Sequence, residues 1–447
     1  MKSEENHIQR LQNNLLEIAR GEPSAVLPLI LATLFIKKSC LTKVRHLDGV
    51  SEKSWFRLRE AKNKLKEINS ILSSIDHHNK RFSSVSGLLQ RDTLRVLSSG
   101  RAVEKVVKLI DEVDVYDQKS LTHLTKCILN SFDEMVGHKG GFGSTSDSIK
   151  KIVAKFSNLD GGTVFDPCIG LGSFSDFDPK KISKVYGQEI NDNTASLSKV
   201  VHYMFGFHDA EIEVGNSLLN PIKTGNGELK TFDFTFSDPP FGMLLKQKDR
   251  ESFSFDEHSF EYGVTTDSNW MFAQRVLASI NTNGVGVVVV SPGALFTQSS
   301  HEVRKEFVLN NNINAVVQLP NQLMSNTTIP CALLVLTKNK TESDILFIKA
   351  DSMGTVKGRT RSLSDDEIEM IVDILKTRKE VPGLSNISEK TEIEKNDFNL
   401  MPQKYVQSVK KMSIYAIPEL LSNVDKSKAE ADLAALRFFK ILKELDT

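Results

Sequence analysis

The stretch "GTVFDPCIGLGSF", residues 162–174, predicts a strand, a glycine turn and the start of a helix. Its β-branched and aromatic residues are typical of a buried strand, which ends at Asp166 and Pro167. Gly170 and Gly172 would let the backbone of the following turn approach a ligand closely. Such a turn lies at the carboxyl end of a strand, where open α/β sheets bind ligands. A plain tight connection explains this turn equally well when it is taken alone.

Short β-branched runs alternate with helix-forming segments on the carboxyl side of this stretch. The runs are "SKVYGQE", "AEIEVGN", "FDFTFSD", "GVGVVVVSP", "INAVVQLP", "CALLVLTKN" and "DILFIKA". Alternation of this kind predicts a parallel or mixed sheet that helices cover on both faces. The expected fold class is therefore α/β.

The flanking regions have a helical pattern. Apolar residues recur at three- and four-residue spacing before about residue 135, as in "LREAKNKLKEINSILSSI". We therefore predict an all-helical N-terminal domain over residues 1–137, a catalytic domain over 138–355 and a helical C-terminal region with a tail over 356–447. The last segment carries one apolar stripe, formed by Leu433, Leu436, Phe439, Leu442 and Leu445. The stripe predicts either a helix packed on its own protein or a coiled-coil arm that docks another chain.

Composition excludes several classes of protein. The 57 basic residues balance 57 acidic ones, so no overall positive charge drives binding to nucleic acid or to an anionic membrane. The four cysteines lie far apart, without the spacing of a zinc site or the density of a disulfide scaffold, which fits a cytoplasmic protein. The apolar run over residues 25–36 is too short to span a bilayer, and we expect a buried helix of a soluble protein there.

Acidic and polar residues follow the first three predicted strands. Glu189 ends the second strand, where a carboxylate can accept hydrogen bonds from ribose hydroxyls. Asp166 would repel a pyrophosphate but suits an ammonium group, so the loop favours an adenosyl cofactor with an amino-acid tail over a dinucleotide. Asn216 and Ser217 follow the third strand and could bind the edge of an adenine ring. A simple Asx or Ser turn is the preferred explanation for these two residues alone.

The fourth strand, in "TFDFTFSDPPFGM" at residues 231–243, ends in a rigid element. Pro239 and Pro240 restrict their own backbone and that of the preceding residues to extended conformations. The Asp238 carboxylate and the Pro239 carbonyl can accept hydrogen bonds from one exocyclic amine, and Phe241 offers a face on which a planar base can stack. The stretch therefore predicts a site for a planar amine.

Together, these motifs resemble those of a known family. "DPCIGLGSF", "GQEI", "GNSL" and "SDPPFG" resemble, in order and spacing, the motifs of amino-directed DNA methyltransferases of the gamma order, which have a Rossmann-like fold. More narrowly, the chain resembles the modification subunit of a type I restriction-modification system. Segments such as "VVVVSPGALF", "AVVQLP" and "EIEKNDFNLMPQKYV" extend the resemblance, which covers nearly the whole chain, although the first 130 residues are similar only in texture.

The resemblance implies a reaction and a set of residues. The reaction is transfer of a methyl group from S-adenosylmethionine to N6 of an adenine flipped out of DNA, without a metal ion. The residues implied to hold the adenine are Asp238, Pro239, Pro240 and Phe241. Those implied to bind the cofactor are Gly141, Thr145, Asp166, Pro167, Gly170, Gly172, Phe174, Glu189, Asn216 and Ser217.

The resemblance also implies partners. These are DNA, a separate specificity subunit that reads the DNA sequence, a second copy of the chain and a restriction subunit. Asp238 stands where the family usually has asparagine, and Ser146 stands where the opening "GxxxTP" element has proline. Two alternatives stay open. One is a methyltransferase of the same fold that acts on protein or RNA, because an Asp-Pro-Pro-aromatic strand end can hold any planar amide or amine. The other, suggested by these departures, is a catalytically silent DNA-binding or scaffolding homologue.

Overall fold

The computed structural model describes most of the chain. The described residues are 2–19, 23–42, 47–89, 100–136, 145–243, 245, 247–253, 260–324, 328–358, 360–407, 424–435 and 437. They fall into two compact units, Met1–Gln407 and Ser408–Thr447. In the smaller unit, residues 424–435 form a helix whose side chains are exposed, including Val424 and Leu433. Of the apolar stripe expected there, only Leu433 lies within the described residues.

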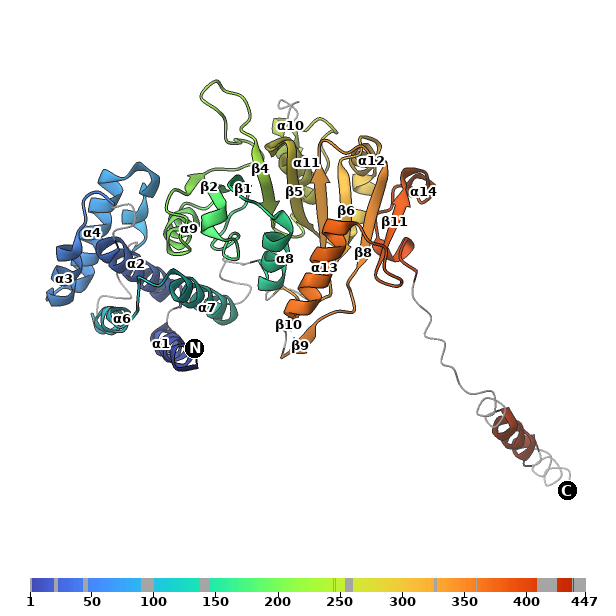
Figure 1. Cartoon of the computed structure of the whole chain (residues 1–447), viewed down its shortest axis with the longest axis horizontal. Coiled ribbons are helices and arrows are strands. Elements are labelled where there is room, and N and C mark those ends of the chain that lie inside the picture. Colours follow the sequence, from blue (N-terminus) through green and yellow to red (C-terminus); the bar gives the residue numbers. More distant parts are fainter. Residues whose placement is uncertain are drawn as a thin grey trace. The chain divides into compact units, whose positions relative to one another are not determined.

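A nine-stranded sheet forms the centre of the larger unit (Figure 1). Its order is β11-β8-β6-β7-β5-β4-β1-β2-β3. The strands are β1 (Gly162–Asp166), β2 (Ile182–Glu189), β3 (Glu211–Val214), β4 (Phe232–Ser237), β5 (Ile280–Val290), β6 (Ile313–Gln318), β7 (Ala332–Thr337), β8 (Asp344–Lys349) and β11 (Ser385–Glu389). The neighbouring strands β3, β2, β1, β4 and β5 pair in parallel. Strand β7 runs antiparallel to both β5 and β6. The α/β fold is confirmed, and the eight predicted runs are β1 to β8.

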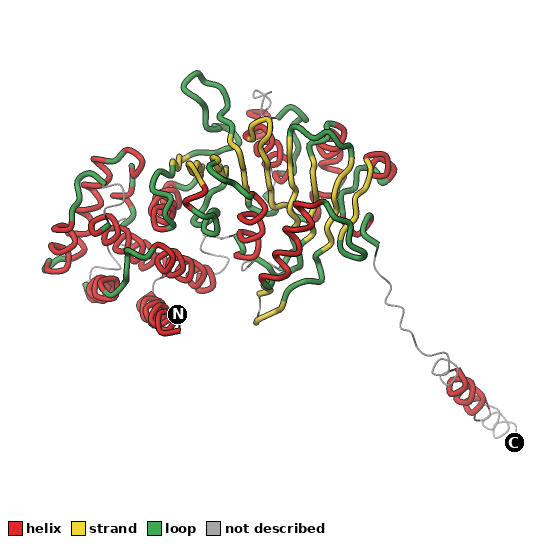
Figure 2. The backbone as a smooth tube through the Cα atoms, in the orientation of Figure 1, coloured by secondary structure: helices red, strands yellow, loops and turns green. Residues whose placement is uncertain are grey.

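Two hydrophobic cores cover the two faces of the sheet. On one face, Phe234 and Val287 pack with residues of α8 (Asp147–Ser157), α9 (Asp192–Met204) and α13 (Asp365–Thr377). On the other face, Val288 and Val290 pack with α11 (Ser268–Ser279) and α12 (His301–Leu309). Figure 2 shows the sheet in yellow between these helices. The second half of β5, Val287–Val290, is therefore a continuous apolar run because both of its faces are buried.

The order of the strands reverses between β1 and β4. From β1 the sheet continues through β2 and β3 in one direction, and through β4 and β5 in the other. β1 and β4 are paired directly, with Phe165 opposite Thr235. In open α/β sheets, the crevice at the carboxyl ends of such a pair of strands is the usual position of the ligand.

Helices form the N-terminal part of the larger unit. They are α1 (Lys2–Ala19), α2 (Pro23–Leu41), α3 (Glu52–Glu60), α4 (Lys64–His78), α6 (Arg101–Asp111) and α7 (Gln118–Val136). Among the described residues, one helix, α2, is long and apolar enough to cross a membrane, but 89% of its apolar window is buried inside the protein. The core that buries α2 continues without a break into the sheet. The boundaries predicted at residues 137 and 355 stay predictions.

Three short strands interrupt the region that we expected to be helical after residue 355. β9 (Thr355–Lys357) and β10 (Thr360–Ser362) form a two-stranded sheet, and β11 pairs antiparallel with β8. The remaining described helices of the larger unit are α10 (Gln247–Phe253) and α14 (Lys390–Lys395), with short 3-10 helices at Lys80–Phe82, Val85–Gly87, Pro179–Lys181, Pro292–Leu295, Gln298–Ser300 and Pro402–Lys404. The segment "SNISE" of β11 has little intrinsic preference for a strand, and pairing with the edge of the sheet decides its structure.

Candidate functional site

Asp166 lies at the carboxyl end of β1 with its side chain fully buried. Its Oδ1 accepts a hydrogen bond of 2.7 Å from the backbone N–H of Cys168, whereas its Oδ2 has no hydrogen-bond partner. Burial raises the pKa of Asp166 to about 7. The nearby Ser173 hydroxyl and the Cys168 N–H oppose this rise, and the charges of Asp238 and Glu189 add to it. A cationic group placed next to Oδ2 would therefore gain a strong interaction.

The glycine turn after Asp166 lies directly against β2. The N–H of Ile169 donates to the Gln188 carbonyl at 3.0 Å, and Gly170 has a φ of +50°. A Cβ added to Gly187 of β2 would come within 2.3 Å of the Ile169 side chain. Gly187 is thus a residue of the site that the sequence analysis did not identify. Its only signal in the sequence is a glycine inside a predicted strand, which indicates close approach of another segment.

Asp238 follows β4 directly, and β4 pairs in parallel with β1, which ends at Asp166. Burial raises its pKa to about 6, while a hydrogen bond from the Thr145 side chain and the charge of Lys150 oppose this rise. Pro239 is buried, and the Phe241 ring is only partly buried. The structure therefore brings Thr145, which the sequence suggested for the cofactor, into contact with the predicted target-base residue.

Glu189 and Asn216 lie after the neighbouring strands β2 and β3. Glu189 Oε1 accepts the N–H of Asn191 at 2.9 Å, and Asn216 Oδ1 accepts the N–H of Leu218 at 3.0 Å. The Asx turn that we considered for Asn216 is present. The next residue, Ser217, is buried. Since β1, β2 and β3 pair in parallel, the residues at their carboxyl ends lie along one edge of the sheet.

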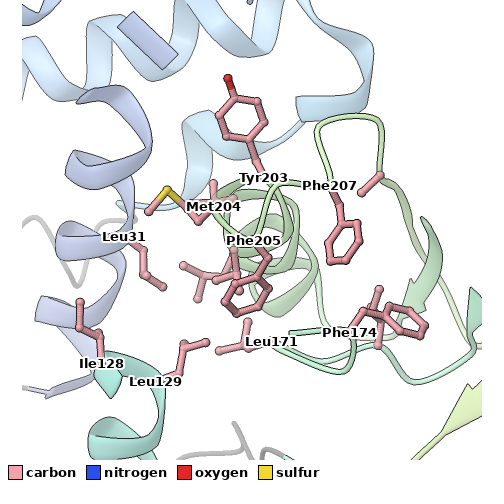
Figure 3. Close-up of a cluster of buried hydrophobic side chains, with 14 of the residues drawn as sticks. Leu31, Ile128, Leu129, Leu171, Phe174, Tyr203, Met204, Phe205 and Phe207 are labelled. Carbon is pink, nitrogen blue, oxygen red and sulfur yellow. The ribbon is translucent and has the colours of Figure 1, made fainter. Parts of the chain in front are cut away.

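One of the predicted cofactor residues, Phe174, lies in the hydrophobic core rather than at this edge. It is fully buried there (Figure 3). Its ring packs against Phe177 and His202. Gly141 lies outside the described residues. Pro167 and Gly172 are buried in the loop, and Pro240 is exposed beyond Asp238. The polar candidates thus lie at the carboxyl edge of the sheet, whereas Phe174 packs in the hydrophobic core.

Several buried polar atoms at this edge lack a hydrogen-bond partner. Besides Asp166 Oδ2, they include Gln188 Oε1 in β2 and Gln318 Oε1 at the end of β6. Each such atom costs about 1–3 kcal/mol unless a water molecule or a ligand satisfies it. Among the described residues, no group of three or more His, Cys, Asp or Glu side chains is arranged to hold a metal ion. The three unpartnered oxygens are thus available to accept hydrogen bonds from a ligand.

Comparison with known proteins relates the chain to DNA methylases. Residues 117–413 match the sequence profile described as N-6 DNA Methylase. A type I restriction enzyme MjaVIII methylase subunit from Methanocaldococcus jannaschii is 27% identical over 392 residues, covering 80% of this chain and 66% of that protein. A type I restriction enzyme HindI methylase subunit from Haemophilus influenzae is 27% identical over 379 residues, covering 76% of this chain and 82% of that protein.

Solved structures share the fold. A type I restriction-modification system methyltransferase subunit from Streptococcus thermophilus superposes with a TM-score of 0.75 at 20% identity, covering 90% of this chain and all of that one. A chain from a type I R-M system structure superposes with a TM-score of 0.64 at 16% identity, covering 99% of this chain and 98% of that one. The chain thus spans about two thirds of the MjaVIII subunit but nearly the full length of these structures.

Proposed function

The chain belongs to the N-6 DNA methylase family, and from this premise we propose that it transfers a methyl group from S-adenosylmethionine to N6 of adenine in DNA. The observation that carries the proposal is a pair of carboxyls at the carboxyl ends of β1 and β4, where the strand order reverses: Asp166, which is buried, and Asp238, which is partly buried. Burial raises the pKa of both. One carboxyl is available for the cofactor and the other for the target base.

The residues of the first three strand ends fit the cofactor. The unpartnered Oδ2 of Asp166 would accept a hydrogen bond from the ammonium group of the amino-acid tail, which favours the ionised carboxylate. Glu189 would hold the ribose hydroxyls and Asn216 with Ser217 the adenine edge, while Pro167, Gly170 and Gly172 shape the loop. When bound, the cofactor supplies an electrophilic methyl group on its sulfonium. For Phe174 we propose a packing role beneath the loop, because its ring is buried in the core.

The end of β4 fits the target adenine. The Asp238 carboxylate and the Pro239 carbonyl would accept the two N–H groups of the exocyclic amine and direct its lone pair toward the methyl group. Positive charge that develops on the nitrogen is stabilised by the same two oxygens. Phe241 would stack on the base, Pro240 would keep the backbone rigid, and the hydrogen bond from Thr145 would orient the carboxylate. A carboxylate accepts hydrogen bonds at least as well as the amide that is usual in the family.

Recognition of a DNA sequence is proposed to require a separate specificity subunit. The chain has a formal net charge of zero, so phosphate contacts must come from local patches or from a partner. The exposed helix over residues 424–435 and the N-terminal helices are the proposed docking elements. A second copy of the chain and a restriction subunit are further proposed partners. The free cysteines, Cys40, Cys127, Cys168 and Cys331, fit the cytoplasm as the compartment.

Methyl transfer from labelled cofactor tests the proposal. The full chain is incubated with labelled S-adenosylmethionine and DNA, alone and with the product of the neighbouring gene, and the labelled nucleoside is identified. We expect N6-methyladenine, with label lost in Asp238→Ala. Label in protein or RNA would favour an acceptor other than DNA, and cofactor binding without any transfer would favour a silent scaffold.

A further inference from the structure

Helix α7 links the N-terminal helices to the loops of the sheet. On the N-terminal side, Gln12 of α1 donates to Ser131 Oγ of α7 at 2.8 Å. On the other side, Gln118 donates to the Met204 carbonyl at the end of α9, at 2.6 Å. The family match begins at residue 117, directly before α7. The helix therefore belongs with the methylase fold as much as with the N-terminal helices.

A first set of contacts, made by Lys126 and Leu129, joins α7 to the glycine loop after β1; we call it the first arm. Lys126 Nζ lies 2.7 Å from Asp176 Oδ1, and the two side chains are only 19% and 11% exposed. A turn further on, Leu129 Cδ1 lies 3.9 Å from the position of a Cβ on Gly172. Figure 3 shows Leu129 next to Leu171 in the cluster of buried side chains beneath the loop. Both an ion pair and apolar packing thus attach the loop to α7.

A second set of contacts, made by Asn130 and called the second arm, joins α7 to the start of α8. Asn130 Nδ2 donates to Asp147 Oδ2 at 2.8 Å, and Asp147 Oδ1 lies 2.8 Å from the buried ammonium group of Lys150. Thr145, which precedes this helix, hydrogen-bonds the Asp238 carboxyl, and the charge of Lys150 favours its ionised form. The second arm therefore leads to the proposed target-base residue.

Lys126, Leu129 and Asn130 occupy one face of α7, because residues three and four apart are neighbours on a helix. One rigid element thus holds the loop on one side and the support of Asp238 on the other. We propose that α7 sets the spacing between the cofactor loop and the target-base residues, with Lys126 and Asn130 as its positioning residues. The inference rests on the proposed function. Such spacing matters because a misplacement of about 1 Å can cost on the order of a hundredfold in rate.

Cofactor affinity tests the first arm. In the full chain, the Kd for S-adenosylmethionine is measured by titration calorimetry for Lys126→Met, Asp176→Asn and the double variant. We expect each single variant to bind about tenfold more weakly, with no further loss in the double variant because the two residues act as one unit. Lys126→Arg keeps the ion pair and should stay near the wild-type affinity. Lys119→Met, at an exposed position of the same helix, is the matched control and should also bind as the wild type.

Hydrogen exchange without cofactor tests both arms independently of binding. Lys126→Met should raise exchange over residues 167–177 and leave residues 147–157 unchanged, whereas Asn130→Ala should do the reverse. Wild-type protection in both variants, or independent losses of affinity that add in the double variant, would overturn the role of α7. If the wild-type chain binds no S-adenosylmethionine, the proposed function fails, while the exchange pattern still decides whether α7 holds the two segments.

Discussion

Replacing Asp166 with asparagine should stabilise the free chain and weaken its binding of the cofactor. The carboxyl is fully buried, with one oxygen unpartnered, and burial raises its pKa from 3.8 to about 7. An acid whose pKa is raised on folding keeps its proton in the native state at pH values where the unfolded chain has lost it. Stability is therefore lost as the pH rises from about 4 to about 7, and the loss is complete above that range.

The size of the effect follows from the shift. A change of roughly three pKa units corresponds to about 4 kcal/mol of destabilisation at high pH, at about 1.36 kcal/mol for each unit. Roughly two thirds of this penalty develops between pH 5 and pH 8, since the unfolded chain is already ionised at pH 5. Asp166→Asn removes the titrating group, so the stability of the variant relative to wild type should rise by about 2–3 kcal/mol over that range.

The opposite effect is expected on the cofactor. Loss of a charge-assisted hydrogen bond to the ammonium group, about 1.5–3 kcal/mol, should weaken S-adenosylmethionine binding by about 10- to 100-fold. Urea unfolding at pH 5 and pH 8, followed by the fluorescence of Trp55 and Trp270, measures the first effect, and calorimetric titration measures the second.

Asp233, at the start of β4, provides a control whose pKa is shifted in the opposite direction. Its Oδ2 accepts the N–H of Thr163 at 2.7 Å, and this hydrogen bond holds its pKa below the usual value. The stability that Asp233 contributes is present above pH 4 and lost at lower pH, so Asp233→Asn should destabilise the chain at pH 8. A stability difference for Asp166→Asn that does not change between pH 5 and pH 8 would refute the argument from burial.

Three further outcomes are expected. The rate of methyl transfer should rise as the pH increases through about 6, because burial raises the pKa of Asp238 to that value and its ionised form accepts hydrogen bonds from the amine. A pH–rate profile measures this, and Asp238→Asn should remove the pH dependence while keeping turnover. Gly187→Ala should destabilise the chain by about 1–3 kcal/mol in urea unfolding, because its Cβ would overlap Ile169. Removal of residues 408–447 should leave the unfolding midpoint and cofactor affinity of the larger unit unchanged but abolish co-purification with the specificity subunit.

Local sequence patterns determined most of the fold. Strands β1 to β8 follow from short apolar and β-branched runs, most of which end in acids, glycines or prolines, because both burial and turn formation depend on a few neighbouring residues. The order of the motifs predicted the family, which the match over residues 117–413 confirms. The segment of β11 lacked such a pattern, because pairing with β8 rather than intrinsic preference makes it a strand.

The electrostatic properties of the site depended on the tertiary structure. Sequence indicated acids at Asp166 and Asp238, but burial in the folded chain is what chiefly raises the pKa of Asp166, and the pairing of β1 with β4 adds the smaller effect of the Asp238 charge. Nothing local distinguishes Lys150 from other helical lysines, and its role depends on a helix that packs over the sheet. Likewise, Phe174 follows the glycine loop in sequence yet is buried in the core. The chain by itself thus determined which groups are present, while burial and long-range packing decided their charge, their partners and their spacing, because these depend on residues far apart in the sequence.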